Sequence, residues 1–122
     1  MNLTLPDLKA AEWKDIGGGL LSWDVTPGTG AAVKPGGKVK VHYTGWTTDG
    51  KIFDSSVQRG TPIEFPLTGV IKGWQDGIPG MQPGGVRRLS IPGAMAYGAR
   101  GIPGTIPPNA TLVFEVQLIE VK

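Results

Sequence analysis

Residues 69–80 (GVIKGWQDGIPG) constrain the fold most, because they are the best candidate for a helix in a sequence of strands and turns. Four side chains recur at the i, i+3, i+4, i+7 spacing of one helical face: Ile71, Trp74, Gln75 and Ile78. Pro79 ends the segment, since proline opposes the helical conformation in the residue before it. A helix of about two turns is unstable alone in water, and Gly73 and Gly77 each weaken it by up to ~1 kcal/mol relative to alanine. We therefore expect a sheet to wrap around this helix, with Trp74 as the floor of whatever the sheet encloses.

The composition excludes several classes of function. A chain of 122 residues with a net charge of +2 is most simply one domain, without the strong positive field that would call for nucleic acid. The absence of cysteine excludes disulfides and zinc–thiolate sites, and a single histidine excludes a multi-histidine metal site. No apolar run reaches the ~18 residues of a membrane span, and residues 1–11 lack the apolar core of a signal peptide. We therefore expect no membrane contact, a cytoplasmic location and a monomer.

Glycine and proline cluster between short alternating runs, which is typical of a turn-rich β domain. Six runs are predicted as strands: residues 19–26, 38–46, 51–54, 63–65, 86–91 and 111–120. The clearest alternation is in the second run, where Val39, Val41 and Tyr43 point one way and polar side chains, including His42, point the other way into solvent. These runs predict an α+β fold, with an antiparallel sheet of five to six strands packed on one short helix.

The chain is predicted to consist of a folded domain and an N-terminal arm. Residues 19–122 are predicted to form the folded domain. Residues 1–18 are predicted to be an N-terminal arm, in which a short helix could begin after Pro6 and Trp13 either packs on the domain or is exposed. Arg87 and Arg88 are interpreted as surface charge, since strand alternation exposes one of the two easily.

Motifs for covalent or phosphate chemistry are absent from the sequence. No G-x-S-x-G elbow surrounds a serine, and there is no phosphate loop or dinucleotide glycine pattern. An enzyme built from this chain would therefore form no obvious covalent intermediate and would need no metal or other cofactor. What remains is a set of aromatic side chains on the faces assigned inward: Tyr43, Phe53, Trp74, Tyr97 and Phe114.

Five segments together resemble one known family. They are residues 41–45 (VHYTG), 49–56 (DGKIFDSS), 70–74 (VIKGW), 96–98 (AYG) and 106–116 (IPPNATLVFEV). In this order and spacing they resemble the FKBP-type peptidyl-prolyl cis-trans isomerases, over roughly residues 19–122. The resemblance implies a half-barrel antiparallel sheet wrapped around a short helix.

The resemblance also implies a proline-binding pocket. Its floor would be Trp74 and its walls Tyr43, Phe53 and Phe114, with Val70, Ile71, Ile63 and Ile106 contributing further substrate contacts. Catalytic contacts would come from the Ile71 N–H and the Tyr97 phenol, which donate to substrate carbonyls, and from the Asp54 carboxylate at the pocket edge. Arg59 matches a basic residue that pairs with Asp54 and Tyr43 in some relatives.

The implied partners are proline-containing peptides, unfolded proteins and macrolide inhibitors of the rapamycin type. Several positions depart from the family pattern: Ile63 stands where many relatives have an aromatic residue, Ile102 replaces a frequent histidine, and Thr105 takes a position often held by an apolar residue. These departures fall on the rim, so they bear on sequence preference and inhibitor affinity more than on activity.

Two classes of function remain open at this point. One is an isomerase acting on X-Pro bonds, and the other is a module that captures proline-containing segments with little turnover. A small-molecule carrier is a weaker third possibility. Without the resemblance, Tyr43, Phe53 and Phe114 are most simply core residues, and Asp54 before two serines is most simply a turn cap.

Overall fold

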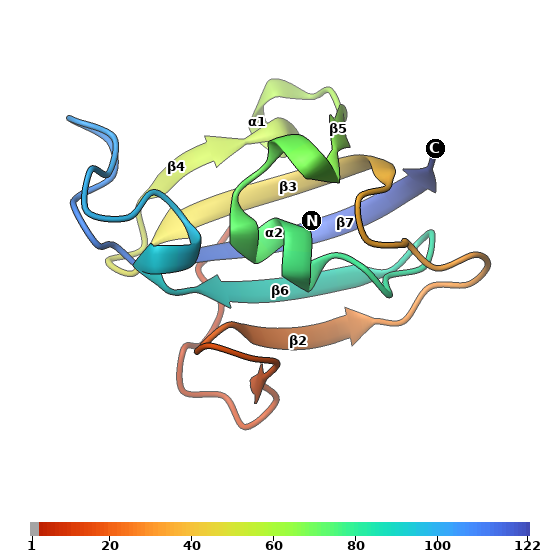
Figure 1. Ribbon diagram of the computed structural model, residues 1–122, viewed down its shortest axis with the longest axis horizontal. Coiled ribbons are helices and arrows are strands. Elements are labelled where there is room, and N and C mark those ends of the chain that lie inside the picture. The colour runs from red at the N-terminus through yellow and green to blue at the C-terminus, as the bar shows by residue number, and fades with distance from the viewer. Residues whose placement is uncertain (1–2) are drawn as a thin grey trace.

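The computed structural model describes residues 3–122, which form one antiparallel sheet with a short helix across one face (Figure 1). The strands are β1 (Lys14–Asp15), β2 (Leu21–Thr26), β3 (Lys38–Thr47), β4 (Ile52–Ser55), β5 (Ile63–Pro66), β6 (Val86–Ile91) and β7 (Leu112–Val121). The helices are α1 (Ser56–Arg59) and α2 (Lys72–Gly77), with 3-10 turns at Leu67–Gly69 and Gly93–Met95. The strand order is β1-β2-β6-β7-β3-β4, and β5 also pairs with β3.

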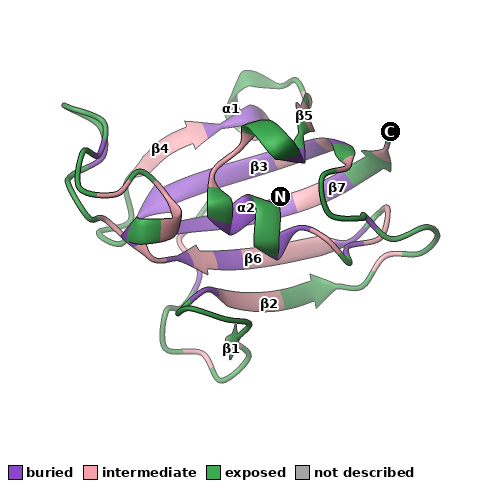
Figure 2. Ribbon diagram, in the orientation of Figure 1, coloured by how far each residue is buried: buried purple, intermediate pink, exposed green. Residues whose placement is uncertain are grey.

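This arrangement confirms the predicted α+β fold. The described residues form seven strands rather than five or six, because the two residues of β1 pair with β2. The short helix expected after Pro6 is not formed among residues 3–18. The antiparallel ladder between β3 and β7 runs from Val39↔Val121 to Thr47↔Leu112 and makes these two strands the buried centre of the sheet (Figure 2).

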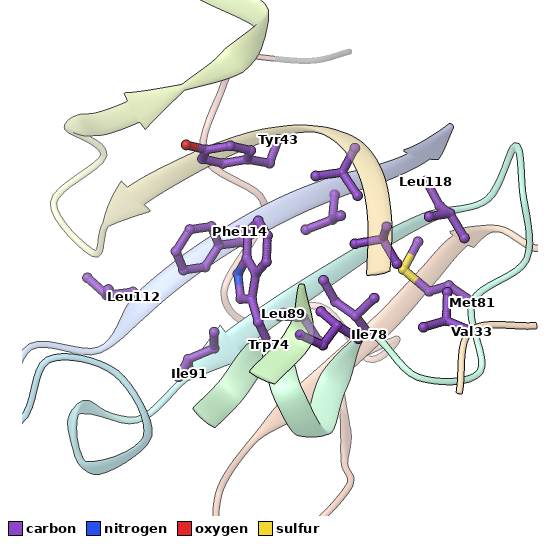
Figure 3. Packing of buried hydrophobic residues seen from close by; sticks show 14 of the residues in the cluster. Val33, Tyr43, Trp74, Ile78, Met81, Leu89, Ile91, Leu112, Phe114 and Leu118 are labelled. Carbon is purple, nitrogen blue, oxygen red and sulfur yellow. The ribbon is translucent and has the colours of Figure 1, made fainter. Parts of the chain in front are cut away.

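The main hydrophobic core lies between α2 and the sheet. The β3 side chains that enter this core are the three predicted from strand alternation: Val39 and Val41 are fully buried, and Tyr43 is 5% exposed. Figure 3 shows the aromatic rings of Tyr43, Trp74 and Phe114 at one end of this core and the aliphatic side chains of Val33, Met81 and Leu118 at the other. A pocket opens at the aromatic end of the core.

Helix α2 is shorter than residues 69–80, because Val70 and Ile71 have extended backbone and helical geometry begins only at Lys72. Its two glycines are packing residues. A Cβ atom at Gly73 would lie 2.5 Å from Cγ2 of Ile91, and one at Gly77 would lie 2.7 Å from Cδ2 of Leu89. Glycine therefore costs helix propensity here but allows the helix backbone to approach β6.

Arg87 and Arg88 are not surface charges, because both side chains are about 15% exposed and both are ion-paired. Arg87 donates from Nη1 to the carbonyls of Gly77 (2.7 Å) and Pro79 (3.2 Å). It thereby satisfies backbone acceptors at the C-terminal end of α2, where a cation is favoured. Helix α2 packs on one face of β6 and the Trp23 ring covers Arg88 on the other, so alternation exposes neither arginine.

The opposite face of the sheet is covered by the N-terminal residues. Trp46 is fully buried on this face, and its Nε1 donates to the carbonyl of Leu3 at 3.3 Å. Trp13 packs edge-on against Trp23, with ring centroids 5.5 Å apart. Glu115 is paired with Arg88 at 2.9 Å and is only 4% exposed.

His42 lies on the same outer face but is half-buried rather than free in solvent. Its Nδ1 lies 3.0 Å from the Oγ atom of Ser56, the first residue of α1, which also accepts the Tyr43 N–H at 2.7 Å.

Within residues 3–122 no helix is long and apolar enough to cross a membrane.

Candidate active site

A pocket of about 590 Å³ opens between α2, the β4–α1–β5 segment and the loop that joins β6 to β7, residues 92–111, named the late loop. Its lining residues come from distant parts of the chain: Tyr43, Phe53, Asp54, Arg59, Ile63, Phe65, Gly69, Val70, Ile71, Trp74, Tyr97 and Phe114. Most of these side chains are aromatic or aliphatic, and only Asp54 and Arg59 carry charge. The lining is therefore typical of a site that binds an apolar group and orients it with a few polar contacts.

The floor of the pocket is a cluster of edge-to-face aromatic rings around Trp74. The Trp74 ring lies 5.2 Å from Tyr43, 5.3 Å from Phe65 and 5.4 Å from Phe114, measured between ring centroids. These distances and the near-perpendicular planes are the favourable geometry for aromatic pairs. The indole is 4% exposed, yet its Nε1 has no hydrogen-bond partner within the described residues. The floor thus combines a rigid apolar surface with one unused donor.

Gly45 of β3 is what lets two of these rings meet. A Cβ atom at this position would lie 2.6 Å from Cζ of Phe53 and 2.8 Å from Cε1 of Phe114. With glycine there, the two rings pack edge-on over the strand with their centroids 5.5 Å apart. The wall of the pocket therefore depends on a residue that has no side chain.

The polar edge of the pocket is a three-membered network. The Tyr43 hydroxyl donates to Oδ2 of Asp54, Arg59 donates from Nη1 to Oδ1, and Arg59 Nη2 lies 3.3 Å from the Tyr43 oxygen. Helix α1 brings Arg59 back to Asp54: Ser55 caps its start by accepting the Gln58 N–H, and the left-handed Gly60 (φ 76°) ends it. The ion pair thus joins two residues that are five positions apart in the chain.

The network holds its members in fixed charge states. Burial, with the hydrogen bond to Asp54, raises the pKa of Tyr43 to about 12. Burial acts to raise the pKa of Asp54, but the hydrogen bonds from Tyr43 and Arg59 outweigh it and the pKa is lowered. The hydrogen bonds to Tyr43 and Asp54 raise the pKa of Arg59. Near neutral pH the edge therefore consists of a neutral phenol, a carboxylate and a guanidinium, and none of them is poised to transfer a proton.

Two further donors face the pocket from its rim. The N–H of Ile71, at the start of α2, has no acceptor among residues 3–122. The side chain of Tyr97 on the late loop is 39% exposed, and burial followed by the charge of Asp54 raises the pKa of its phenol. Both groups are free to donate to carbonyl oxygens of a bound chain.

The structure brings ten of the eleven predicted site residues into this lining, and the exception is Ile106. Ile106 is 3% exposed and belongs to the hydrophobic core, and it contributes to a different groove. Paired backbone hydrogen bonds of 2.8 Å with Ile102 hold it there. Two lining residues, Phe65 and Gly69, were not predicted. Phe65 follows Ile63 by two positions on β5, so strand alternation places both on one face, whereas Gly69 offers no side-chain pattern.

Comparison with known proteins identifies the family. Residues 30–119 match the model of the FKBP-type peptidyl-prolyl cis-trans isomerase family. The chain belongs to this family. A protein named FK506-binding protein from Neisseria meningitidis serogroup B is 49% identical over 106 residues, covering 85% of this chain and 97% of its own. The peptidyl-prolyl cis-trans isomerase FPR2 of Saccharomyces cerevisiae is 57% identical over 91 residues, covering 72% of this chain and 67% of its own.

The fold of this FKBP-family chain also matches solved structures. The crystal structure of a peptidyl-prolyl cis-trans isomerase from Pseudomonas syringae superimposes with a TM-score of 0.86 at 41% identity, covering 93% of this chain and 84% of that one. FkpA from Escherichia coli superimposes with a TM-score of 0.87 at 46% identity, covering 93% of this chain and 53% of that one. The family named from sequence motifs is thus confirmed by sequence and by structure.

Proposed function

We propose that this protein is a peptidyl-prolyl cis-trans isomerase that accelerates rotation about X-Pro bonds in peptides and unfolded chains. The observation that carries the proposal is the pocket floor, where Trp74 meets three aromatic rings. Beside it lie two donors that have no acceptor among residues 3–122, the Ile71 N–H and the Tyr97 hydroxyl. A proline ring fits such an apolar surface, and the donors match the carbonyl groups that flank it. Family membership supports the same assignment.

The reaction makes and breaks no covalent bond, so the pocket must act on the amide itself. Rotation crosses a barrier of ~18–20 kcal/mol, because twisting removes the resonance of the amide. The twisted amide is less charge-separated than the planar one. A desolvated aromatic pocket therefore binds the twisted state better than the ground state, which is differential binding of the transition state.

The donors fix the geometry of the twisted bond. The Ile71 N–H and the Tyr97 hydroxyl would hold carbonyl groups on either side of the proline, so that rotation occurs against fixed anchors. An acceleration of ~10⁵ requires about 7 kcal/mol, whereas one neutral hydrogen bond contributes ~1 kcal/mol. No single donor therefore accounts for catalysis, and the aromatic floor has to supply most of the effect.

Asp54 acts through charge and position. Tyr43 and Arg59 each hold one of its oxygens, so the carboxylate is not a free base. It places a fixed negative charge at the pocket edge, and it orients the Tyr43 ring that forms part of the wall. We infer that its loss reduces activity in part rather than abolishing it.

The alternative function is a proline-binding module with little turnover. Both functions need the same pocket, so loss of binding in a pocket variant does not separate them. Turnover does: an isomerase speeds cis-trans exchange of a peptide present in large excess, whereas a binding module only broadens its resonances.

The test is NMR exchange on a short Leu-Pro peptide with a catalytic amount of protein, with and without rapamycin. We expect accelerated exchange that the macrolide abolishes by filling the pocket. Phe114→Ala should remove most of the acceleration, Tyr97→Phe should reduce it about five-fold, as expected for ~1 kcal/mol, and Trp13→Phe, outside the pocket, should leave it unchanged. Peptide binding without accelerated exchange would exclude the isomerase in favour of the binding module.

A further inference from the structure

A second groove, of about 660 Å³, lies between the turn that joins β3 to β4 and the late loop. We name it the turn–loop groove. One wall is formed by residues 47–51, and the other by residues 100–111 with the exposed rings of Pro107 and Pro108. Figure 1 shows the late loop folded beside the β3–β4 turn, away from α2. The function proposed above does not use this groove.

Two cations of the groove form no ion pair among the described residues. Lys51 and Arg100 are both exposed, and neither makes an ion pair within residues 3–122. The one anion of the lining, Asp49, is engaged locally by the Thr47 hydroxyl and by the Lys51 N–H at 3.1 Å. The lining thus carries one excess positive charge, with both cationic head groups available to a ligand.

Short chain segments link both walls of the turn–loop groove to the aromatic pocket. Lys51 precedes the pocket residue Phe53 by two positions, so their Cα atoms are at most ~7 Å apart. Arg100 follows the pocket residue Tyr97 by three positions on the late loop. A peptide extending from the pocket reaches the groove within about two to four residues, at ~3.3 Å per residue.

We propose that the turn–loop groove binds an acidic stretch of the same polypeptide whose proline occupies the aromatic pocket. Lys51 and Arg100 pair with its carboxylates, and the proline-rich wall packs against its backbone. This inference rests on the proposed function and deepens it, because it assigns a preference for acidic residues flanking the isomerised bond. The cations favour this occupant over a basic or neutral segment.

The test uses paired Leu-Pro peptides of equal length. One member carries two glutamates, placed about two to four residues from the proline on either flank, and the other carries glutamines at the same positions. Exposed ion pairs are weak, so we expect KM for the glutamate peptide to be about four-fold lower on one flank, with kcat unchanged. The preference should reverse in Lys51→Glu/Arg100→Glu, where like charges face each other, and it should disappear at about 1 M salt, where charges are screened beyond ~3 Å.

A matched control separates the groove from net charge. Lys9→Glu/Lys34→Glu changes the charge equally at exposed sites outside both pockets and should keep the preference. Equal KM values for the paired peptides on both flanks would overturn the proposal. So would a preference that survives in Lys51→Glu/Arg100→Glu.

The outcome for the groove is distinguishable from that for the isomerase. The glutamine peptide tests the proposed function alone, since it makes no charge contact. If that peptide shows no accelerated exchange, NMR titration of the same peptides gives their Kd values. A four-fold ratio between them, reversed in Lys51→Glu/Arg100→Glu, still supports the groove, and equal Kd values overturn it.

Discussion

Replacing Gly73 by alanine sets two physical effects against each other in α2. Helix propensity alone predicts stabilisation, because alanine is favoured over glycine by ~1 kcal/mol in a helix interior. The structure predicts the opposite. The new Cβ would lie 2.5 Å from Cγ2, 2.6 Å from Cδ1 and 2.7 Å from Cγ1 of Ile91, which is fully buried and branched at Cβ. Ile91 has no free end that can turn away, so the helix must move.

The magnitude follows from the cost of overpacking. Inserting a methyl group into a filled core costs about 1–3 kcal/mol. After subtraction of the propensity gain, Gly73→Ala should lower the free energy of unfolding by up to about 2 kcal/mol. Activity should fall as well, because the displaced helix carries Trp74. Gly77→Ala should be milder, since the Cβ there meets the terminal methyl groups of Leu89 at 2.7 and 2.9 Å.

Urea unfolding followed by tryptophan fluorescence measures the effect. Gly69→Ala is the matched control, because its Cβ would meet only Cγ of Pro66, at an ordinary 3.7 Å. In an Ile91→Ala background the cost of Gly73→Ala should disappear, giving a coupling energy of about 1–3 kcal/mol. A Gly73→Ala protein that is more stable than the wild type would refute the reasoning, and so would additive effects of Gly73→Ala and Ile91→Ala.

Three further predictions concern polar contacts. In Tyr97→Phe the only remaining tyrosine is Tyr43, and its alkaline absorbance should titrate with a pKa of about 12. Adding Asp54→Asn removes an anion and should lower that pKa; an unchanged titration would contradict the network. Because the folded pKa of Tyr43 is raised above 10.0, the stability it contributes should be fully present below pH 10.0 and be lost as the pH rises through about 12. The difference in unfolding free energy from Tyr43→Phe should therefore narrow over that interval, and a constant difference would count against it. Arg87→Met should lower the free energy of unfolding by about 2 kcal/mol, because the Gly77 carbonyl loses a charged donor; an unchanged urea midpoint would show that the contact is not stabilising.

Patterns with a clear period were enough to predict the sheet and most of the pocket. Alternation in β3 correctly placed Val39, Val41 and Tyr43 in the core, because the strand side chains alternate strictly. Trp74 was identified as the floor, since a short helix with one large apolar residue can be held only by packing on that residue. The other aromatic pocket residues, except Phe65, then followed from the family motifs.

What sequence patterns missed depends on close contact between distant segments. Gly45 and Gly73 are conspicuous in the structure because rings and branched side chains occupy the space of a Cβ, and no local pattern records such a neighbour. Arg87 and Arg88 were assigned to solvent because alternation assumes one open face. Both faces of β6 are in fact covered: α2 packs on one, and Trp23 and Glu115 enclose Arg88 on the other.

The place of β7 in the sheet has a consequence for synthesis of the chain. This strand is the last in sequence, yet it lies between β6 and β3 and joins the two halves of the sheet. A nascent chain that ends before Leu112 holds β2 and β6 on one side and β3 with β4 on the other, without the strand that connects them. Because sheet pairing between distant segments is slow and depends on loop closure, the domain should fold only after residues 112–121 have left the ribosome. Until then its strand edges are open to chaperones and to other chains.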